Sequence, residues 1–501
     1  MPARLEIALG RAGRLSSAPR RDPGAPMRIL LCGDFSGRGA RRLDDPSALA
    51  TRRVLRADLD NLDALIARLT PVVELSDGGA TASIAFATLD DFHPDRLFDR
   101  LDAFAHLRGL RQRLLDPARF EQASAELLGA DAEPDEATIQ RLLGRPAPAL
   151  APKPEPRAGT AAAALAELMR RIVAPDVVAD IGPRQAQLVG ALDLAIAEQM
   201  RHVLHEPRFQ AVEALWRTVQ LLVTRLELDQ DLQLDLFDVT RAELDASAAE
   251  PELERCGLWK ALVERQPDPG SAPGWSMVVV LESFGPASAD LALLASLARV
   301  AAANGAPLLC TAAPSLFGCD SLPLTPDHQD WRPLDADSQS RWQALRRSAL
   351  APWIGLVVPR LLLRLPYGKG TDPLERFDLD EMAGADPAQA LLWGHPGAAC
   401  ALLAGLAYRG SGWEMDLNAQ LDLDDLPAWV YTEDGERRIY PAAEAWLGER
   451  AGQALLERGL MPLMSRRDRP AVRLMRWQSI AEPSAELSAE PSTELAGPWR
   501  R

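Results

Sequence analysis

Short apolar runs alternate with amphipathic stretches along most of the chain. Fully apolar runs, as expected for strands buried on both faces, occupy residues 27–34, 277–281, 307–311 and 354–358. Two nearby stretches, 291–303 and 342–350, repeat their apolar side chains at helical spacing. Strands that alternate with helices in this way predict an α/β fold with parallel strands in a sheet flanked by helices.

Other strands are predicted to have one apolar face or to flank a turn. Residues 232–239 and 471–477 alternate apolar and polar side chains, which is typical of half-buried strands. Two further pairs of strands surround turn signals: 72–75 and 83–89 around Asp77-Gly78-Gly79, and 429–431 and 438–440 around Asp434-Gly435.

Helices are predicted where apolar side chains recur every three or four residues. They cover residues 58–69, 94–114, 161–173, 184–205, 209–222, 388–406 and 442–458. Asp91 is the candidate cap of the helix whose first turn contains Pro94. Pro207 restarts a helix, and Gly459 ends the last one.

The chain begins with a strand pattern of its own. Leu5, Ile7 and Leu9 lie on one face of residues 4–9. The polar stretch 10–26, which contains proline and glycine, separates this strand from the next domain. A tethered strand at the start of a chain can pair with another molecule.

Composition divides the chain into five segments. Residues 144–160 are rich in proline, alanine and charge and predict a semi-extended linker, which at roughly 3.1 Å per residue spans on the order of 50 Å. After residue 480, repeats of Ala-Glu-Pro-Ser type predict a disordered tail. The expected division is an arm (1–26), a first domain (27–143), the linker (144–160), a second domain (161–480) and the tail (481–501).

Charge and cysteine content narrow the function classes. A net charge of −16 argues against nucleic acid as a main partner, and 501 residues are too many for one ordinary core. No apolar run is long enough to span a membrane, and no secretory signal is evident. The five scattered cysteines suit a reducing cytoplasm, the expected location.

Three patterns resemble catalytic or binding motifs, but none has the required spacing. Gly368-Lys369-Gly370-Thr371 has Leu363 where a phosphate loop needs its first glycine, and Gly370 where it needs a hydroxyl. The glycines of 33–39 do not follow the dinucleotide spacing, and His202 and His205 stand three apart without the glutamate of a zinc helix. We therefore expect no catalytic residues, cofactor or metal, and an enzyme with an unrecognised site is the alternative class.

The segment 359–373 carries the most specific pattern in the chain. Its characteristic residues are Pro359, Arg360, Arg364, Tyr367, Gly368, Asp372 and Pro373. Spaced in this way, they resemble a signature of the large sheath subunit (TssC) of bacterial type VI secretion systems. The run 204–217, which ends in Trp216-Arg217, and the elements 314–317 and 459–463 resemble further parts of the same family.

The beginning of the chain resembles the small sheath subunit (TssB) of the same machine. The similarity runs from about residue 4 to 128 and rests on 33–38, which contains Asp34 and Arg38, on 60–63, and on 89–95, which contains Pro94. His93 stands where this family usually has serine. In order, the two resemblances indicate a fusion of a small and a large sheath subunit.

The resemblance implies a structural protein whose copies assemble helically around an inner tube and contract to drive secretion. The implied partners are further copies of the chain, an Hcp-like tube protein, baseplate proteins and a Clp-type disassembly ATPase, for which 161–173 is the positional candidate. It also implies exchanged strands, so the expected self-assembly residues are Leu5, Ile7 and Leu9 with Val472 and Leu474. A baseplate or cap component that forms no long tubes is the other alternative.

Overall fold

A computed structural model describes residues 25–77, 80–128, 181–265, 274–433, 435–467 and 469–482. The predicted arm strand, the linker 144–160, the helix 161–173 and all but the first two residues of the tail lie outside these ranges. We call residues 27–128 the first block and residues 181–482 the second block. The two blocks correspond to the two family resemblances.

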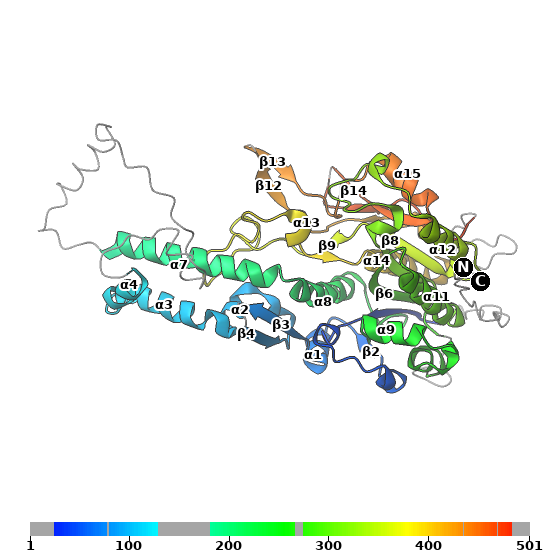
Figure 1. The fold of residues 1–501 in the computed structure, drawn as a ribbon, viewed down its shortest axis with the longest axis horizontal. Coiled ribbons are helices and arrows are strands. Elements are labelled where there is room, and N and C mark those ends of the chain that lie inside the picture. Colours follow the sequence, from blue (N-terminus) through cyan, green and yellow to red (C-terminus); the bar gives the residue numbers. More distant parts are fainter. Residues whose placement is uncertain are drawn as a thin grey trace, which may run out of the picture.

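A nine-stranded mixed sheet forms the centre of the molecule and confirms the α/β class (Figure 1). Its strands, in spatial order, are β11 (Asp422–Leu423), β15 (Val472–Leu474), β14 (Leu460–Ser465), β8 (Ile354–Val358), β7 (Leu308–Ala312), β6 (Met277–Phe284), β1 (Met27–Gly33), β5 (Leu232–Asp238) and β2 (Leu55–Ala57). The six strands from β14 to β5 are parallel, whereas β2, β15 and β11 pair antiparallel. The fully apolar runs became the parallel centre because that centre is covered on both faces.

The first block supplies a central strand of this sheet. β1 lies between β5 and β6, both from the second block, with Leu31 opposite Leu236 on one side and Val279 on the other. The predicted half-buried strand 232–239 is β5, and it is almost wholly buried because apolar layers cover both of its faces: Leu234 and Leu236 lie in one layer and Phe237 in the other. The two blocks therefore share one sheet and the apolar layers on both of its faces.

Alternate side chains of the central strands point into two apolar layers. Ile29 and Leu31 belong to the layer that contains α8 and α14, while Leu30 and Cys32 belong to the other. Helices on the first side are α1 (Leu62–Leu69), α2 (Pro94–Arg100), α3 (Ala105–Leu115), α4 (Phe120–Leu128), α7 (Ile181–Leu204), α8 (Pro207–Arg225) and α14 (Gly397–Ser411). Helices on the second side are α9 (Arg241–Ala248), α10 (Gly257–Trp259), α11 (Ser288–Ala303), α12 (Ala336–Arg346) and α15 (Glu449–Glu457).

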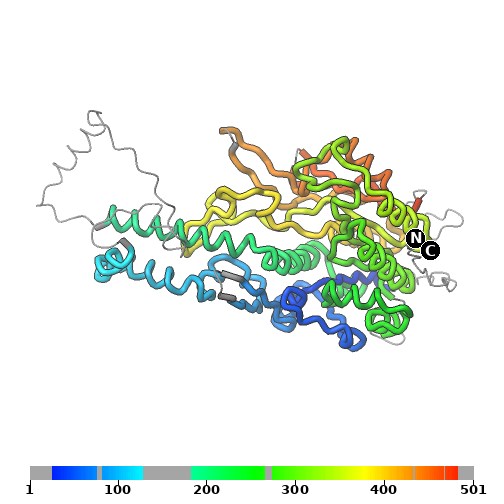
Figure 2. The backbone as a smooth tube through the Cα atoms, in the orientation of Figure 1, coloured from blue at the N-terminus to red at the C-terminus, as the bar shows by residue number. Residues whose placement is uncertain are grey.

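Helices α3, α4 and α7 form a helical extension that reaches well beyond the sheet (Figure 2). Arg111 on α3 pairs with Asp193 on α7, with 2.7 Å between Nε and Oδ1. The apolar side chains predicted for 94–114 are buried, but the chain bends at Leu101 between α2 and α3, so this is not one continuous helix. The predicted cap, Asp91, belongs to the turn before α2. The residue that caps α2 is His93, whose side chain accepts a hydrogen bond from the Asp95 amide.

Three small sheets complete the fold: β3 (Val72–Asp77) with β4 (Ala80–Ala85), β9 (Leu361–Leu362) with β10 (Trp393–Gly394), and β12 (Val430–Glu433) with β13 (Glu436–Ile439). The β12–β13 pair confirms the predicted hairpin. The described residues contain no helix long and apolar enough to cross a membrane.

Two predicted helices are wrong in extent. Residues 388–406 form a short α13 (Pro387–Ala390), then β10, then α14, because Trp393 pairs with Leu362 and Pro396 disfavours helix in the residue before it. Of 442–458, only 449–457 is helical. The preceding residues run extended because the Ala442 carbonyl and the Glu444 amide bond the backbone of the 360–362 segment.

Two further helical stretches begin or end elsewhere than predicted. The stretch 342–350 belongs to α12, which begins at Ala336 and ends at Arg346. The helix starts early because the Asp335 carboxylate accepts a hydrogen bond from the Ser338 amide, 2.9 Å away, and so caps the first turn. The stretch 58–69 becomes helical only at Leu62, after an Asp58–Asn61 turn.

Candidate functional site: buried ion pairs where the two blocks meet

Arg364, from the signature segment, lies at the centre of a buried ionic cluster. Its Nε is 2.8 Å from Oε1 of Glu213 on α8, and its Nη1 is 2.8 Å from Oε2 of Glu381. Neither carboxylate is exposed, and the arginine side chain is 9% exposed. Burial by itself lowers the pKa of Arg364, but the two carboxylates outweigh it and hold that pKa well above its usual value.

Tyr367 extends this cluster through its backbone amide and its ring, and its hydroxyl contacts helix α8. Its amide donates to Glu381, 2.6 Å away, and its ring lies 4.3 Å from the Arg364 guanidinium. Arg217 donates to the Tyr367 hydroxyl at 3.3 Å and also pairs with Glu213. Burial raises the pKa of the Tyr367 hydroxyl, so it remains protonated and able to hydrogen-bond. The cluster is therefore a network of these five side chains, and the His205 imidazole lies beside it, 3.9 Å from Oε1 of Glu381.

The loop after the cluster contacts the first block. Asp95, at the amino end of α2, accepts hydrogen bonds from the backbone amides of Glu375 and Arg376, each at 3.1 Å. His93 packs edge-on against Tyr367, with ring centroids 5.0 Å apart. The imidazole that replaces the family's serine therefore touches the signature segment directly. Pro94 is buried in the first turn of α2.

A second ionic cluster joins the blocks at the carboxyl ends of β1 and β5. Arg38 pairs with Asp238 and Glu243, at 3.1 Å and 3.0 Å. Arg52 also pairs with Glu243, which has no exposed surface. Although burial favours the protonated acid, hydrogen bonds from Arg52 and the Thr240 amide lower the pKa of Glu243 to about 2. Asp34 accepts the backbone amides of Arg38 and Gly39 and so shapes the loop.

The remaining signature residues also hold loops and helices in place. The indole of Trp216 donates to the Phe35 carbonyl at 3.0 Å, so it too links the blocks. Arg360 forms two hydrogen bonds with Glu444, and the Val358–Pro359 peptide is cis. Gly368 and Asp372 pair through their backbones in the turn that leads to Pro373.

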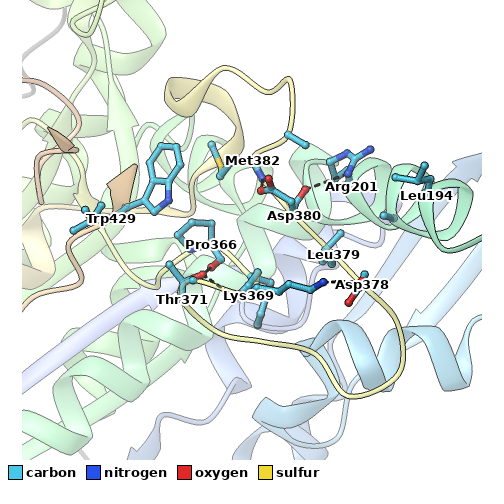
Figure 3. Close-up of a pocket in the computed structure, with 16 residues that line it drawn as sticks. Leu194, Arg201, Pro366, Lys369, Thr371, Asp378, Leu379, Asp380, Met382 and Trp429 are labelled. Carbon is cyan, nitrogen blue, oxygen red and sulfur yellow. Dashed lines mark hydrogen bonds and ion pairs between the residues drawn. The ribbon is translucent and has the colours of Figure 1, made fainter. Parts of the chain in front are cut away.

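A pocket of about 560 Å³ lies beside the signature turn, between α7 and the base of the β12–β13 hairpin (Figure 3). Pro366, Lys369 and Met382 are among its lining residues. The Lys369 ammonium is directed at Asp378, 2.8 Å away. The glycine-rich turn therefore presents a lysine that is paired with a carboxylate, in an ion pair whose side chains are 76% and 70% exposed.

The predicted self-assembly residues fall into two groups. Leu5, Ile7 and Leu9 lie outside the described residues. Val472 and Leu474 have no exposed surface, and β15 is already flanked by β11 and β14. Among the described residues, the open edges of the large sheet are therefore β11 and β2.

Sequence reasoning did not identify Glu381, Asp238 and Glu243, which complete the two clusters, or Glu444, the partner of Arg360. Glu213 lies within the run 204–217 that resembles the large sheath subunit, but the motif gave it no ionic role. Glu213 offered a signal, because it lies one turn from Phe209 and Trp216 on the apolar face of α8, where a carboxylate needs a buried partner. Among the described residues, no group of three or more His, Cys, Asp or Glu side chains could hold a metal ion. All five cysteines are buried, and burial raises the pKa of the Cys32 thiol to about 12.

The two blocks share one sheet, and buried ion pairs hold them together. These features are typical of a structural protein, and the comparison with known families gives the same class. The chain belongs to the VipB family of tail sheath proteins: residues 186–481 match the model described as EvpB/VC_A0108, tail sheath N-terminal domain. Residues 20–126 match a second model, described as Type VI secretion system, VipA, VC_A0107 or Hcp2. The presence of both families in one chain confirms the predicted fusion.

Two curated relatives cover the same two regions. The chain is 25% identical to the type VI secretion system sheath protein TssC1 of Pseudomonas aeruginosa over 305 residues, which is 59% of this chain and 61% of the relative. It is 26% identical over 132 residues to the sheath protein TssB1 of the same organism, covering 25% of this chain and 75% of the relative. The chain thus spans about three fifths of its large sheath relative. This family is a family of structural proteins.

Proposed function

We propose that this protein is a subunit of a type VI secretion contractile sheath that carries both sheath components in one polypeptide. The observation that carries the proposal is the position of β1 between β5 and β6. The region similar to the small sheath protein fills the centre of the sheet built by the region similar to the large one. One chain would thus act as the repeating unit, in the cytoplasm.

Copies would assemble helically by strand exchange. The large sheet has an open edge at β11, where Asp422 and Leu423 pair on one side only among the described residues. Residue 25, at the end of the arm, is held next to α14: its carbonyl accepts hydrogen bonds from Tyr408 and Trp413. Helix α14 also packs on β11, so the arm leaves the body of the molecule on the helix that contacts this edge. An apolar strand entering at β11 from a neighbouring copy would extend the sheet by main-chain pairing. Such a head-to-tail contact repeats without closing.

The other expected partners follow from the same role. An inner Hcp-like tube would be surrounded by the assembly, baseplate proteins would start it, and contraction would move the tube. A Clp-type ATPase would recycle the contracted form, with 161–173 as its candidate contact. The buried ion pairs would keep each copy rigid while contacts between copies rearrange, because breaking a buried pair is costly.

Electron microscopy of the purified full chain, alone and with the cognate tube protein, tests the proposal. A sheath subunit forms hollow helical tubes, and the tube protein lengthens or orders them. A baseplate or cap component, the second candidate, gives rings or short stacks that the tube protein does not lengthen. Monodisperse particles under both conditions contradict both candidates.

A further inference from the structure

The first half of α7 has an exposed face that carries no charge. Pro183, Ala186, Gln187, Gly190 and Leu194 are exposed, and their spacing of three and four residues places them on one side of the helix. Leu194 is 59% exposed. The opposite side of the helix packs against α3 (Figure 1). Helix faces that remain in water usually carry charged side chains, so this surface, which we call the α7 face, has the composition of a contact surface.

Gly190 lies in the middle of the α7 face without a reason inside the helix. A Cβ atom at this position would meet no side chain and no neighbouring element within 4 Å. Only proline is a weaker helix former than glycine, so alanine would suit the helix better if this face stayed in water. The glycine leaves space between Ala186 and Leu194 into which a large side chain from another segment can fit.

The same side of α7 is covered where the helix approaches the signature turn. Ala197 is buried and lines the pocket there together with Leu379 and Met382, and Leu194 is the lining residue nearest the amino end of α7 (Figure 3). The exposed part, 183–194, is about 17 Å long at 1.5 Å per residue. An occupant that fits this length is an element of about three helical turns.

The chain itself supplies an element of this length next to the α7 face. The predicted helix 161–173 lies outside the described residues, and only residues 174–180 separate it from Ile181, where α7 begins. Connections of this length join antiparallel helices that pack side by side. A helix over 161–173 would be about 20 Å long at 1.5 Å per residue, close to the length of the α7 face. Pro175 favours a helix end just before it.

The side chains of 161–173 complement the α7 face in size. The large apolar residues share one side of the predicted helix and the charged residues share the other: Leu165, Leu168, Met169 and Ile172 against Glu167, Arg170 and Arg171. An antiparallel pair joined by 174–180 would place Met169 near Ala186, Leu165 near Gly190 and Ala161 near Leu194. Large side chains then lie opposite small ones along the contact, as close packing between helices requires.

We propose that residues 161–173 dock as a helix on the α7 face of their own chain. The short tether favours this occupant over a second copy, because it holds the segment at a high effective concentration beside α7. The inference goes beyond the proposed function, since it concerns a single copy and does not depend on assembly. Docking covers the apolar side of 161–173 and leaves its charged side in solvent. Another protein can then reach that apolar side only after the segment leaves α7.

Two introduced cysteines test the contact directly. Leu165→Cys with Gly190→Cys should form an intramolecular disulfide, because docking brings the two Cα atoms within the distance that a disulfide spans. Glu167→Cys with Gly190→Cys is the matched control, since it has nearly the same tether but lies on the charged side of the predicted helix. The native cysteines are all buried and do not compete.

The rate of disulfide formation in dilute solution, followed by peptide mass spectrometry, is the measurement. We expect the Leu165→Cys pair to close about tenfold faster than the control, because docking raises the effective concentration of one pair of thiols only. Equal rates overturn the inference. Linked dimers in place of the intramolecular product would assign the α7 face to a second copy and overturn it as well.

Hydrogen exchange provides the second measurement. In the parent, the amides of 161–173 should exchange about tenfold more slowly than those of the predicted linker 144–160, because docking protects helical hydrogen bonds. Gly190→Glu should abolish this protection, since it places a charge opposite Leu165. Gly109→Glu is the matched control: Gly109 lies within α3, and a Cβ atom there also meets nothing within 4 Å.

The outcomes separate this inference from the proposed function. Exchange in the parent as fast as in the linker, or protection that survives Gly190→Glu, overturns the inference and leaves the proposed function standing. A parent chain that forms no helical assembly overturns the proposed function and leaves the docking of 161–173 standing.

Discussion

Arg364 and Glu213 form an ion pair across two segments of the second block, with 2.8 Å between Nε and Oε1 and almost no contact with solvent. Each charge has lost its hydration, and only its partners compensate for that loss. A complete buried pair contributes little net stability, but a broken one leaves an uncompensated charge in a medium of low polarity. Arg364 therefore adds little net stability through attraction. Its main effect is that Glu213 is not left as a buried, unpaired carboxylate.

The first prediction follows from this asymmetry. Glu213→Gln should lower the free energy of unfolding by about 3 kcal/mol, because Arg364 keeps only Glu381 as a charged partner. Urea denaturation followed by tryptophan fluorescence measures the change. Lys369→Gln is the control: its pair with Asp378 is 76% and 70% exposed, and we expect a change below about 0.5 kcal/mol. Equal midpoints for the two variants would show that the cluster is not a structural centre.

The second prediction concerns the contact between the blocks. Asp95→Ala removes the acceptor for two backbone amides, those of Glu375 and Arg376, and should cost about 1–2 kcal/mol. Hydrogen exchange should be faster at those two amides in the variant than in the parent. Asp99→Ala, which removes only an exposed ion pair to Arg376, should leave both amides protected. Unchanged protection in Asp95→Ala would mean that other contacts hold the loop.

Local pattern was sufficient to predict the central strands and several helices, because complete burial selects continuous apolar runs. Residues 27–34 and 354–358 became β1 and β8 for this reason. The sequence near residue 30 does not predict that β1 lies between β5 and β6. Its neighbours are some 200 residues away, and strand order depends on how the crossovers pack.

The errors and omissions have the same origin in tertiary contacts. The stretch 442–448 has helical spacing, but its backbone bonds the 360–362 segment, and this pairing overrides local propensity. The motifs identified Arg360 and Arg364 as important without revealing Glu444 and Glu381, whose carboxylates meet the arginines only after folding. For these two ion pairs, the sequence thus located the arginine but not its carboxylate partner.

The third prediction is a pH dependence of stability that arises at Glu282. Burial raises the pKa of Glu282 from 4.5 to about 7. Arg241, 3.9 Å away, opposes this shift more weakly, and repulsion from Asp34, Asp245 and Asp290 adds to it. The folded state then holds a proton that the unfolded state releases. This stabilisation is complete below about pH 4.5 and is lost as the pH rises through 7. Because the side chain is 27% exposed, we expect a loss of about 1–2 kcal/mol.

The difference in unfolding free energy between Glu282→Gln and the parent isolates this effect, because the other titrating groups cancel. The difference should grow in favour of the variant between pH 5 and 8. Glu254→Gln, at an exposed ion pair with Arg299, should give a difference that does not vary with pH. A flat difference for Glu282→Gln would place the pKa of this carboxyl near its ordinary value.

The fourth prediction concerns the linker between the blocks. Limited proteolysis should cut first within 145–157, because proline-rich extended chain makes few protective contacts. The two fragments should remain together in size-exclusion chromatography, since separating them would pull β1 out from between β5 and β6. The cut protein should also keep the melting temperature of the intact chain within a few degrees. Fragments that elute separately in native buffer contradict a shared core.

The last prediction concerns the arm. Leu5, Ile7 and Leu9 give one face of residues 4–9 an apolar character, and a lone strand of this kind is unstable in water. We expect it to pair at the β11 edge of a neighbouring copy. Deletion of residues 1–12 should leave the unfolding midpoint unchanged but abolish long assemblies in electron micrographs. Ile7→Pro should do the same because proline removes a ladder donor, whereas Ile7→Val should assemble like the parent. Tubes of parental length from the deletion or the proline variant would mean that copies are held together without strand exchange.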